Sequence, residues 1–287
     1  MMQQRARPPR GHRRVSIPAQ VIVYAILSIG AFVMLFPLLN MVGMSLKTMG
    51  EMASSPISFP QSWQWSNYAT AWQEGTLGRY LINSTIVSAA SVFFVALFSS
   101  MAAYVLARFE FRGNTLIYLL FLAGLALPIP LIAVPLFIIM KNFNLINNLL
   151  SVILVYVASG MSFSVFLLVN FFRTIPVELE EAARIEGANS FQIYASIMVP
   201  LVRPALTTVA LFNFVGSWNG LFFPLIFLSD RSQMTVTVGV LSFVGQYGTQ
   251  WNLLLPALVI VILPTVIVFS LASRQFIRGL TAGAVRA

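Results

Sequence analysis

The residues that most often carry catalytic chemistry are scarce in this sequence. It has no cysteine, and its one histidine, His12, lies in a basic stretch at the N-terminus. Thiolate chemistry, a histidine-dependent metal site and a histidine-containing triad are therefore excluded. The two lysines, Lys47 and Lys141, do not stand in a Gly-x-x-x-x-Gly-Lys-Ser/Thr string, so the chain lacks a phosphate-binding loop of that type. We expect no catalytic residues and no metal site.

Half of the eight acidic residues gather in one segment, residues 173–204. Within it, Thr174 is expected to cap a short helix, Pro176 suits a first helical turn, and glutamates near a helix start complement its dipole. Gly187 is expected to end this helix. The glutamates are Glu178, Glu180, Glu181 and Glu186.

Several side chains of this segment suit contact with another protein. Glu180 and Arg184 are spaced for an i,i+4 ion pair, and Glu181 offers a charge to a basic partner. Ala182 and Ala183 present little side chain, so a second surface can approach the backbone there.

A second helix, capped by Asn189 or Ser190, follows. Its expected apolar face consists of Phe191, Tyr194, Met198 and Leu201, and Pro200 limits its length.

The composition places these short helices on a membrane protein. Charged residues make up 9% of the chain and hydrophobic residues 58%, whereas a soluble domain carries about 25% charged residues. The net charge of +9 does not indicate nucleic acid, because five arginines crowd into the first fourteen residues and the others are scattered singly. We expect no nucleic-acid partner and a lipid environment.

Six segments without Asp, Glu, Lys or Arg are long enough to span a bilayer as helices. The predicted fold is all-α and polytopic. The spans are residues 17–45, 81–107, 114–140, 149–172, 205–228 and 252–273. The predicted organisation is a cytoplasmic basic tail (1–16), a first transmembrane helix (17–45), an external loop (46–80) and a core of five helices (81–287).

The positive charges predict the orientation. Thirteen of the seventeen Lys and Arg residues fall in one alternating set of connecting segments, which includes both termini and 173–204. That set is expected to be cytoplasmic. Outside, Trp63, Trp65, Tyr68 and Trp72 either lie at the membrane interface or pack a small subdomain, and the Gly- and Thr-rich segment 229–251 is expected to fold as an external loop.

One string in the cytoplasmic segment resembles a known motif. Glu181-Ala182-Ala183, three residues, Gly187, nine residues, then Ile197, Val199 and Pro200 resemble the EAA motif of ATP-binding-cassette import permeases. Val199 departs from the family's usual leucine. Weaker likenesses to the carbohydrate branch, specifically MalG-like maltose permeases, run in order from about Phe59 to the C-terminus. They include Trp65-Ser66-Asn67-Tyr68, Ala102 to Phe109, Trp218-Asn219 and Gly245 to Gly248.

The resemblance implies a MetI-like type I importer permease that forms half of a sugar or oligosaccharide pore in a bacterial inner membrane. The implied partners are a second permease, two cytoplasmic ATPase subunits that use ATP and Mg, and an external solute-binding protein. The implied ATPase contact consists of Glu181, Ala182, Ala183, Arg184, Gly187 and Pro200.

Polar or kinking residues inside the spans are candidates for a substrate path. Asn213, Trp218 and Asn219 suit sugar recognition, although an asparagine can equally join helices, and Pro128 either lines a cavity or only kinks its helix. A permease for glycerol phosphate or another non-sugar solute stays open as an alternative. An ion-coupled secondary transporter is disfavoured, because all acidic residues lie outside the spans.

Overall fold

The computed structural model describes residues 17–245 and 248–284, with side chains described to residue 272. The basic tail (1–16), Gln246, Tyr247 and the last three residues lie outside the described part, so the expectations for them have no structural counterpart. The fold is helical, apart from a two-residue pairing of β1 (Val244–Gly245) with β2 (Gly248–Thr249).

Four of the predicted spans are single helices: α1 (Ile17–Ser45), α4 (Leu77–Arg108), α7 (Leu149–Thr174) and α14 (Trp251–Ala284). Each is long and apolar enough to cross a membrane. The predicted bounds hold for α1 and α7 within two residues. However, α4 begins at Leu77 rather than at residue 81, and α14 continues past residue 273 to Ala284.

The third predicted span is broken rather than continuous. Helix α5 (Asn114–Ala126) ends before a 3₁₀ turn, η1 (Ile129–Ile132), and α6 (Ala133–Asn142) leaves at a bend of 93°. Pro128 explains the break, because a residue that precedes proline avoids the helical region, and Leu127 is extended (φ −78°, ψ 119°).

The fifth predicted span, 205–228, is also interrupted. Helix α11 (Arg203–Trp218) ends at Asn219, and a separate helix, α12 (Phe222–Phe227), follows. The chain turns at Gly220 against the ring of Tyr156, where any Cβ would overlap the tyrosine hydroxyl. Before α11, the chain bends by 76° between the stretch Ser190–Leu201 and α11. The bundle therefore has up to six spans, two of them bent.

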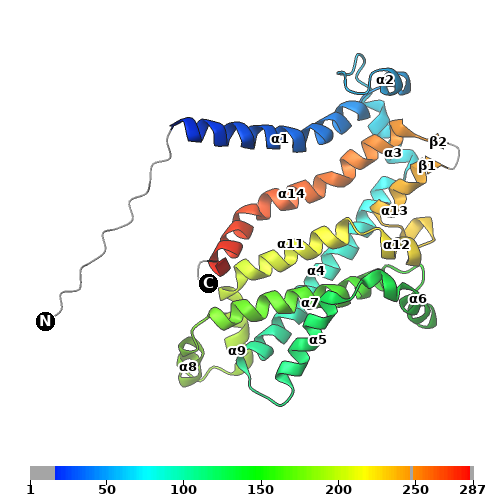
Figure 1. The fold of residues 1–287 in the computed structure, drawn as a ribbon. Helices are drawn as coiled ribbons and strands as arrows, with labels where there is room; N and C mark the ends of the chain where they lie inside the picture. The colour runs from blue at the N-terminus through cyan, green and yellow to red at the C-terminus, as the bar shows by residue number, and fades with distance from the viewer. Residues whose placement is uncertain (1–16, 246–247, 285–287) are drawn as a thin grey trace.

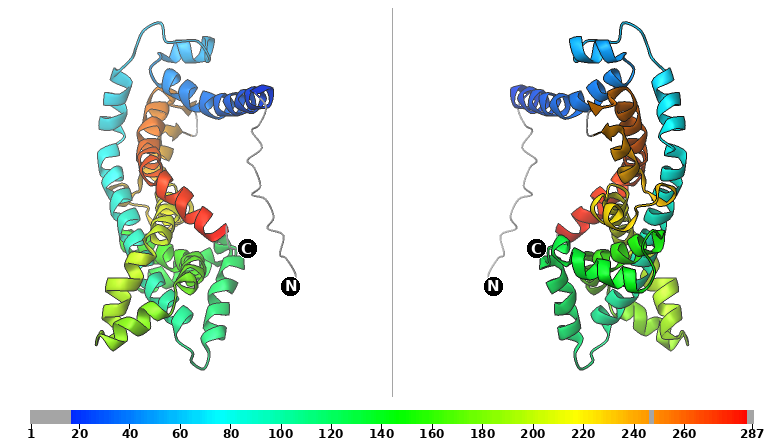
Figure 2. Two further views of the ribbon diagram at one scale, coloured as in Figure 1. Left: turned by 90° about the vertical axis from the view of Figure 1, so that its left-hand side faces the viewer. Right: turned by 90° about the vertical axis from the view of Figure 1, so that its right-hand side faces the viewer.

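Small residues let the bundle pack closely. Helices α4 and α7 share the largest helix-to-helix interface, and α11 packs against both. Ser88 and Ser91 of α4 and Ser164 of α7 are buried there, as is typical of membrane helices that approach closely. Helix α1 stands apart, with no buried residue in its most apolar stretch, and it meets α14 near its C-terminal end (Figures 1 and 2).

The elements collect at two ends of the bundle (Figure 1). At one end lie the short helices α8 (Glu178–Ile185) and α9 (Ser190–Ile193), together with the C-terminal end of α14. At the other end lie α2 (Met49–Ser54), α3 (Ser66–Glu74), the β pairing and α13 (Val236–Val240), which is joined to α12 by a 3₁₀ turn, η3 (Arg231–Gln233).

The segment 229–251 folds back onto the start of α4, in agreement with the prediction that it forms a folded loop. The side-chain amide of Asn83 donates to the carbonyls of Ser232 and Met234, each at 2.9 Å. The amide of Val236 donates to the Ser84 hydroxyl at 2.8 Å. After α13, a 3₁₀ turn, η4 (Leu241–Phe243), leads into the β pairing. The remaining short elements are η2 (Tyr194–Met198) and α10 (Val199–Leu201).

Candidate functional site: a loop at the end of the bundle and a cavity inside it

The first half of the candidate loop is a short helix with a defined end. After α8, the amide of Gly187 donates to the carbonyl of Arg184 and the amide of Ala188 donates to that of Ala183, both at 3.0 Å. This pair of bonds is a Schellman motif, and it requires the left-handed backbone that Gly187 adopts (φ +88°). The predicted glycine stop is confirmed. The predicted cap is wrong, because Thr174 is still part of α7 and Val177 stands at the start of α8.

Helix α8 buries one charged side chain and exposes an apolar stripe among its other charged residues. Glu180 and Ala183 point into the protein, whereas Leu179, Ala182 and Ile185 are exposed, Ile185 at 87%. These last three follow an i, i+3, i+6 spacing and form one stripe. The two alanines thus differ: Ala182 is open to a partner, but Ala183 packs against the chain's own core. Glu181, Arg184 and Gly187 are exposed.

Glu180 is not paired with Arg184, as the spacing predicted, but with an arginine of another helix. Its Oε1 lies 2.7 Å from Nε of Arg108, with both side chains less than 10% exposed. Tyr104 donates its hydroxyl to the other carboxylate oxygen at 3.1 Å. The tertiary contact prevails because Glu180 faces inward on α8, whereas Arg184 faces solvent.

The second half of the loop begins with the predicted cap. The side-chain oxygens of Asn189 and Gln192 each accept from the other's backbone amide, at 2.9 and 2.8 Å, which is a capping box. The predicted apolar face is confirmed for Met198, which is buried, and for Tyr194, which packs against the core, but it is wrong for Phe191 and Leu201, which are exposed. Ile193, which was not predicted, is buried as well.

A π-helical turn shifts the face of the residues that follow Tyr194. Within η2, the amide of Val199 donates to the carbonyl of Tyr194, five residues earlier. The extra residue per turn shifts the register of the following side chains. Pro200, which is partly buried, lacks an amide and would crowd the carbonyl of Ser196 in a regular helix, so the wider turn relieves that conflict.

Inside the bundle, polar side chains line a cavity of about 190 Å³ between α4, α7 and α11. Asn213 contributes its side chain, which donates to the Ser164 hydroxyl at 3.0 Å and to its own helix at 2.8 Å. The hydroxyls of Ser91 and Tyr156 are buried and have no hydrogen-bond partner among the described residues. The cavity is also lined by Ser159, Phe212, Gly216, Ser217 and Phe223.

The other three candidates for a substrate path lie elsewhere. Trp218 is 3% exposed, stacks on Phe214 and donates its indole N–H to the carbonyl of Val261 at 3.0 Å, so it fills the core. Asn219 is exposed and bonds back to its own helix. Pro128 is exposed at the break between α5 and α6. Of the four, only Asn213 lines the cavity.

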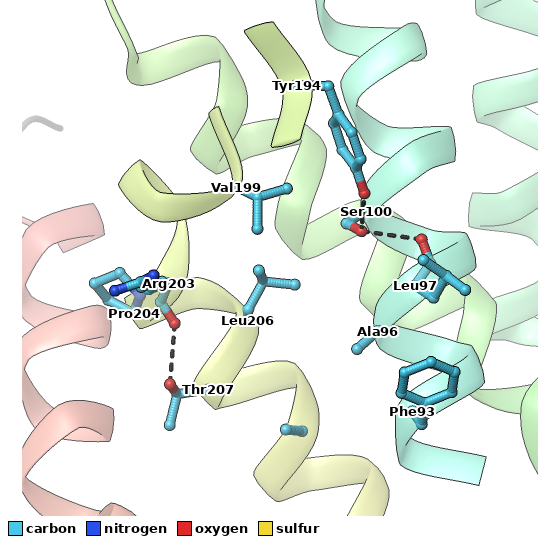
Figure 3. A pocket seen from close by; sticks show the side chains of 11 residues that line it. Phe93, Ala96, Leu97, Ser100, Tyr194, Val199, Arg203, Pro204, Leu206 and Thr207 are labelled. Carbon is cyan, nitrogen blue, oxygen red and sulfur yellow. Dashed lines mark hydrogen bonds between the residues drawn. The ribbon is translucent and has the colours of Figure 1, made fainter. Parts of the chain in front are cut away.

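A second, larger cavity of about 640 Å³ lies beneath the loop, between α4 and α11 (Figure 3). Phe93 and Leu97 of α4 form one wall, and Arg203 and Leu206 of α11 form the other. Tyr194 of the loop reaches across to α4, where its hydroxyl lies 2.7 Å from that of Ser100 (Figure 3).

Sequence reasoning missed the residues of α4 that hold the loop. Arg108 entered as a positive charge that orients the chain and, together with Tyr104, as part of a family likeness, and neither was expected to contact the loop. A signal was present, since an arginine and a tyrosine four residues apart at one end of a span need a partner if they face inward. Among the described residues, no three His, Asp or Glu side chains lie close enough together to hold a metal ion.

Several apolar helices long enough to cross a membrane, with a loop of short helices at one end of the bundle, define a polytopic membrane protein. Residues 96–281 match the family model of the binding-protein-dependent transport system inner membrane component, and the chain belongs to that family.

Relatives and solved structures agree with this assignment. The chain is 37% identical over 267 residues to a diacetylchitobiose uptake system permease protein of Streptomyces coelicolor, covering 92% of this chain and 88% of the relative. It is 33% identical to a melibiose/raffinose/stachyose import permease protein of Bacillus subtilis, covering 96% and 99%. The fold matches a chain of a bacterial ABC transporter for import of the acidic polysaccharide alginate, with a TM-score of 0.81, 22% identity and coverage of 91% and 99%.

Proposed function

We propose that this chain forms half of the pore of an ATP-driven sugar or oligosaccharide importer in a bacterial inner membrane. Its partners are a second permease subunit, two cytoplasmic ATPase subunits that bind ATP and Mg, and an external solute-binding protein. Both termini lie in the cytoplasm. The observation that carries the proposal is the exposed apolar stripe on α8, at the end of the bundle where the positive charges predict the cytoplasm.

The stripe has the properties of a docking surface. Leu179, Ala182 and Ile185 are exposed on a helix outside the predicted spans, and Phe191 on α9 is 70% exposed beside them. Apolar side chains clustered in water mark a protein contact. Glu181 adds a charge next to the stripe, which supports a basic partner surface. Ala183 supports α8 from behind, since it packs in the core.

The polar cavity supports a neutral, hydroxyl-rich substrate. Its polar lining consists of hydroxyl groups and one amide, and none of the charged side chains that the structure describes lines it. The unpartnered hydroxyls of Ser91 and Tyr156 are available to exchange hydrogen bonds with hydroxyls of a sugar. A phosphate would call for arginine, lysine or a helix N-terminus, so this cavity gives no support to glycerol phosphate. The exposed Asn219 and Pro128 are candidates for a path completed by the second permease.

The docking surface is tested with one charge placed on the stripe. Ile185→Asp is expected to lower capture of the cognate ATPase from detergent by about tenfold or more, because a buried apolar contact at an interface centre is worth roughly 2 kcal/mol. Ile57→Asp is the matched control, since Ile57 is 71% exposed at the other end of the bundle. Equal capture by wild type and Ile185→Asp would contradict the proposal.

The substrate cavity is tested with Asn213→Leu in reconstituted vesicles. Loss of about one hydrogen bond in the path predicts roughly a tenfold fall in uptake with ATPase capture unchanged. Asn170→Leu is the matched control, because its side chain also donates to a carbonyl four residues earlier, yet it lies on the exposed face of α7. Uptake at the wild-type level in Asn213→Leu would remove Asn213 from the path.

A further inference from the structure

Three polar side chains form one stripe on the cytoplasmic half of α4. Ser100, Tyr104 and Arg108 are spaced i, i+4 and i+8, so they lie above one another on a single face. Each of them bonds to a different part of the loop that follows α7. This stripe is distinct from the docking surface, because it contacts α8 at the buried Glu180, whereas Leu179, Ala182 and Ile185 are exposed.

Arg108 makes the first connection. Its Nη2 donates to the carbonyl of Ile175 at 2.6 Å, just ahead of α8, and its Nε pairs with the Glu180 carboxylate at 2.7 Å. The two charged side chains are only 7% and 4% exposed. A charge pair out of water is held firmly, because separating the two groups leaves each charge buried and unpaired.

Tyr104 and Ser100 make the other two connections. Tyr104 donates to the second oxygen of Glu180 at 3.1 Å and packs against the ring of Tyr194 at 5.4 Å between centroids. Tyr194 in turn bonds to Ser100, and both residues line the cavity of Figure 3. The loop is thus fixed to α4 before α8, within α8 and after α9.

These connections matter because α4 has no short covalent link to the loop. Helices α7 and α11 continue directly into it, whereas Arg108 and Ile175 are 67 residues apart, and Ser100 and Tyr194 are 94 apart. A push on α8 therefore reaches α7 and α11 through the chain, but reaches α4 directly through this stripe. Ser91, which lines the polar cavity, lies nine residues before Ser100 on the same helix.

We propose that the Ser100, Tyr104 and Arg108 stripe makes α4 move with the α8 loop, and that Glu180 and Arg108 are positioning residues that transmit the movement of a docked partner to the wall of the substrate cavity. This inference rests on the proposed function, since the force comes from the ATPase. In the absence of the stripe, α8 moves with the partner while α4 lags behind.

The experiment separates docking from transmission. Arg108→Gln and Glu180→Gln are each reconstituted with the cognate ATPase, second permease and binding protein, and sugar uptake and ATP hydrolysis are measured together. Both variants are expected to capture the ATPase as wild type does, while uptake per ATP hydrolysed falls about tenfold, within the usual range of a coupling between sites. The matched controls are Arg112→Gln and Glu110→Gln, both exposed in the turn after α4.

A distance measurement distinguishes a loss of transmission from a loss of stability. The chain has no cysteine, so labels at Ile86→Cys on α4 and Val266→Cys on α14 report one distance without background. Nucleotide binding is expected to change this distance in the wild-type background and to leave it unchanged with Arg108→Gln. If Arg108→Gln does not accumulate in the membrane, Tyr194→Phe, which removes one hydroxyl, takes its place with a smaller expected loss.

The inference is wrong if variants that capture the ATPase also show the uptake per ATP hydrolysed and the change in label distance of the wild type. That result would leave the proposed function intact. Failure of the wild-type chain itself to capture any ATPase would instead refute the proposed function.

Discussion

Replacing Gly187 by alanine isolates the role of the corner between α8 and α9. Gly187 has φ +88°, and a Cβ built on it meets no atom within 4 Å. The substitution therefore creates no clash, and its cost is purely that of a left-handed backbone for an L-residue, about 1–2 kcal/mol. That energy corresponds to roughly a 5- to 30-fold shift toward an open Schellman motif.

Gly113 provides an internal control. It also has a positive φ, +94°, and open space around its Cβ, but it lies in the turn between α4 and α5. Gly113→Ala is expected to cost the same backbone energy and to leave the α8 corner unchanged. The two variants therefore differ in which corner is loosened and not in how much strain is added.

Hydrogen exchange at the Ala188 amide measures the effect directly, since this amide donates to Ala183 across the corner. Exchange is expected to accelerate about 5- to 30-fold in Gly187→Ala and to stay unchanged in Gly113→Ala. Gly187→Asn is expected to fall between wild type and Gly187→Ala, because asparagine tolerates the left-handed region. Unchanged protection of Ala188 in Gly187→Ala would refute the reasoning.

Three further outcomes follow from buried or capping groups. Trp218→Phe is expected to lower the thermal unfolding temperature without changing the KM of uptake, because the indole donates to Val261 in the core; a raised KM with unchanged stability would contradict this. Lys47→Met is expected to speed proteolysis of residues 46–80, since it removes the bond of 2.6 Å from Nζ to the carbonyl of Ser55 and leaves that carbonyl only its weaker bonds from Ser58; unchanged cleavage would oppose it. The hydrogen bond from the Thr48 amide lowers the pKa of Glu51, which caps α2. A lowered pKa means that the stabilisation is complete above the ordinary value of 4.5 and is lost as pH falls further, so the protection factors of α2 amides, which are corrected for the intrinsic exchange rate, are expected to fall at low pH in wild type but not in Glu51→Gln.

The spans and the glycine corner were predictable because each depends on local chemistry. Uninterrupted apolar runs need a bilayer, and Gly187 stands where a helix of glutamates and alanines must end. The single helices α1 and α7 follow the prediction closely for that reason.

The wrong predictions concern features that depend on tertiary contacts or on the exact backbone geometry. The partner of Glu180 was assigned within its own helix, but the buried Arg108 of α4 takes it. The apolar face after Asn189 was read with a regular helical period, which the π turn before Pro200 shifts. Trp218 and Asn213 are both suited to sugars by type, and only packing shows that one fills the core and the other lines a cavity.

Cross-linking from two neighbouring alanines tests the central claim most directly. Ala182 is exposed on α8, whereas Ala183 is 7% exposed and faces the core. In this cysteine-free chain, Ala182→Cys is expected to form a cross-link to the cognate ATPase in assembled complexes, and Ala183→Cys is not. Equal cross-linking from both positions, or none from Ala182→Cys, would contradict docking of the ATPase on the exposed face of α8.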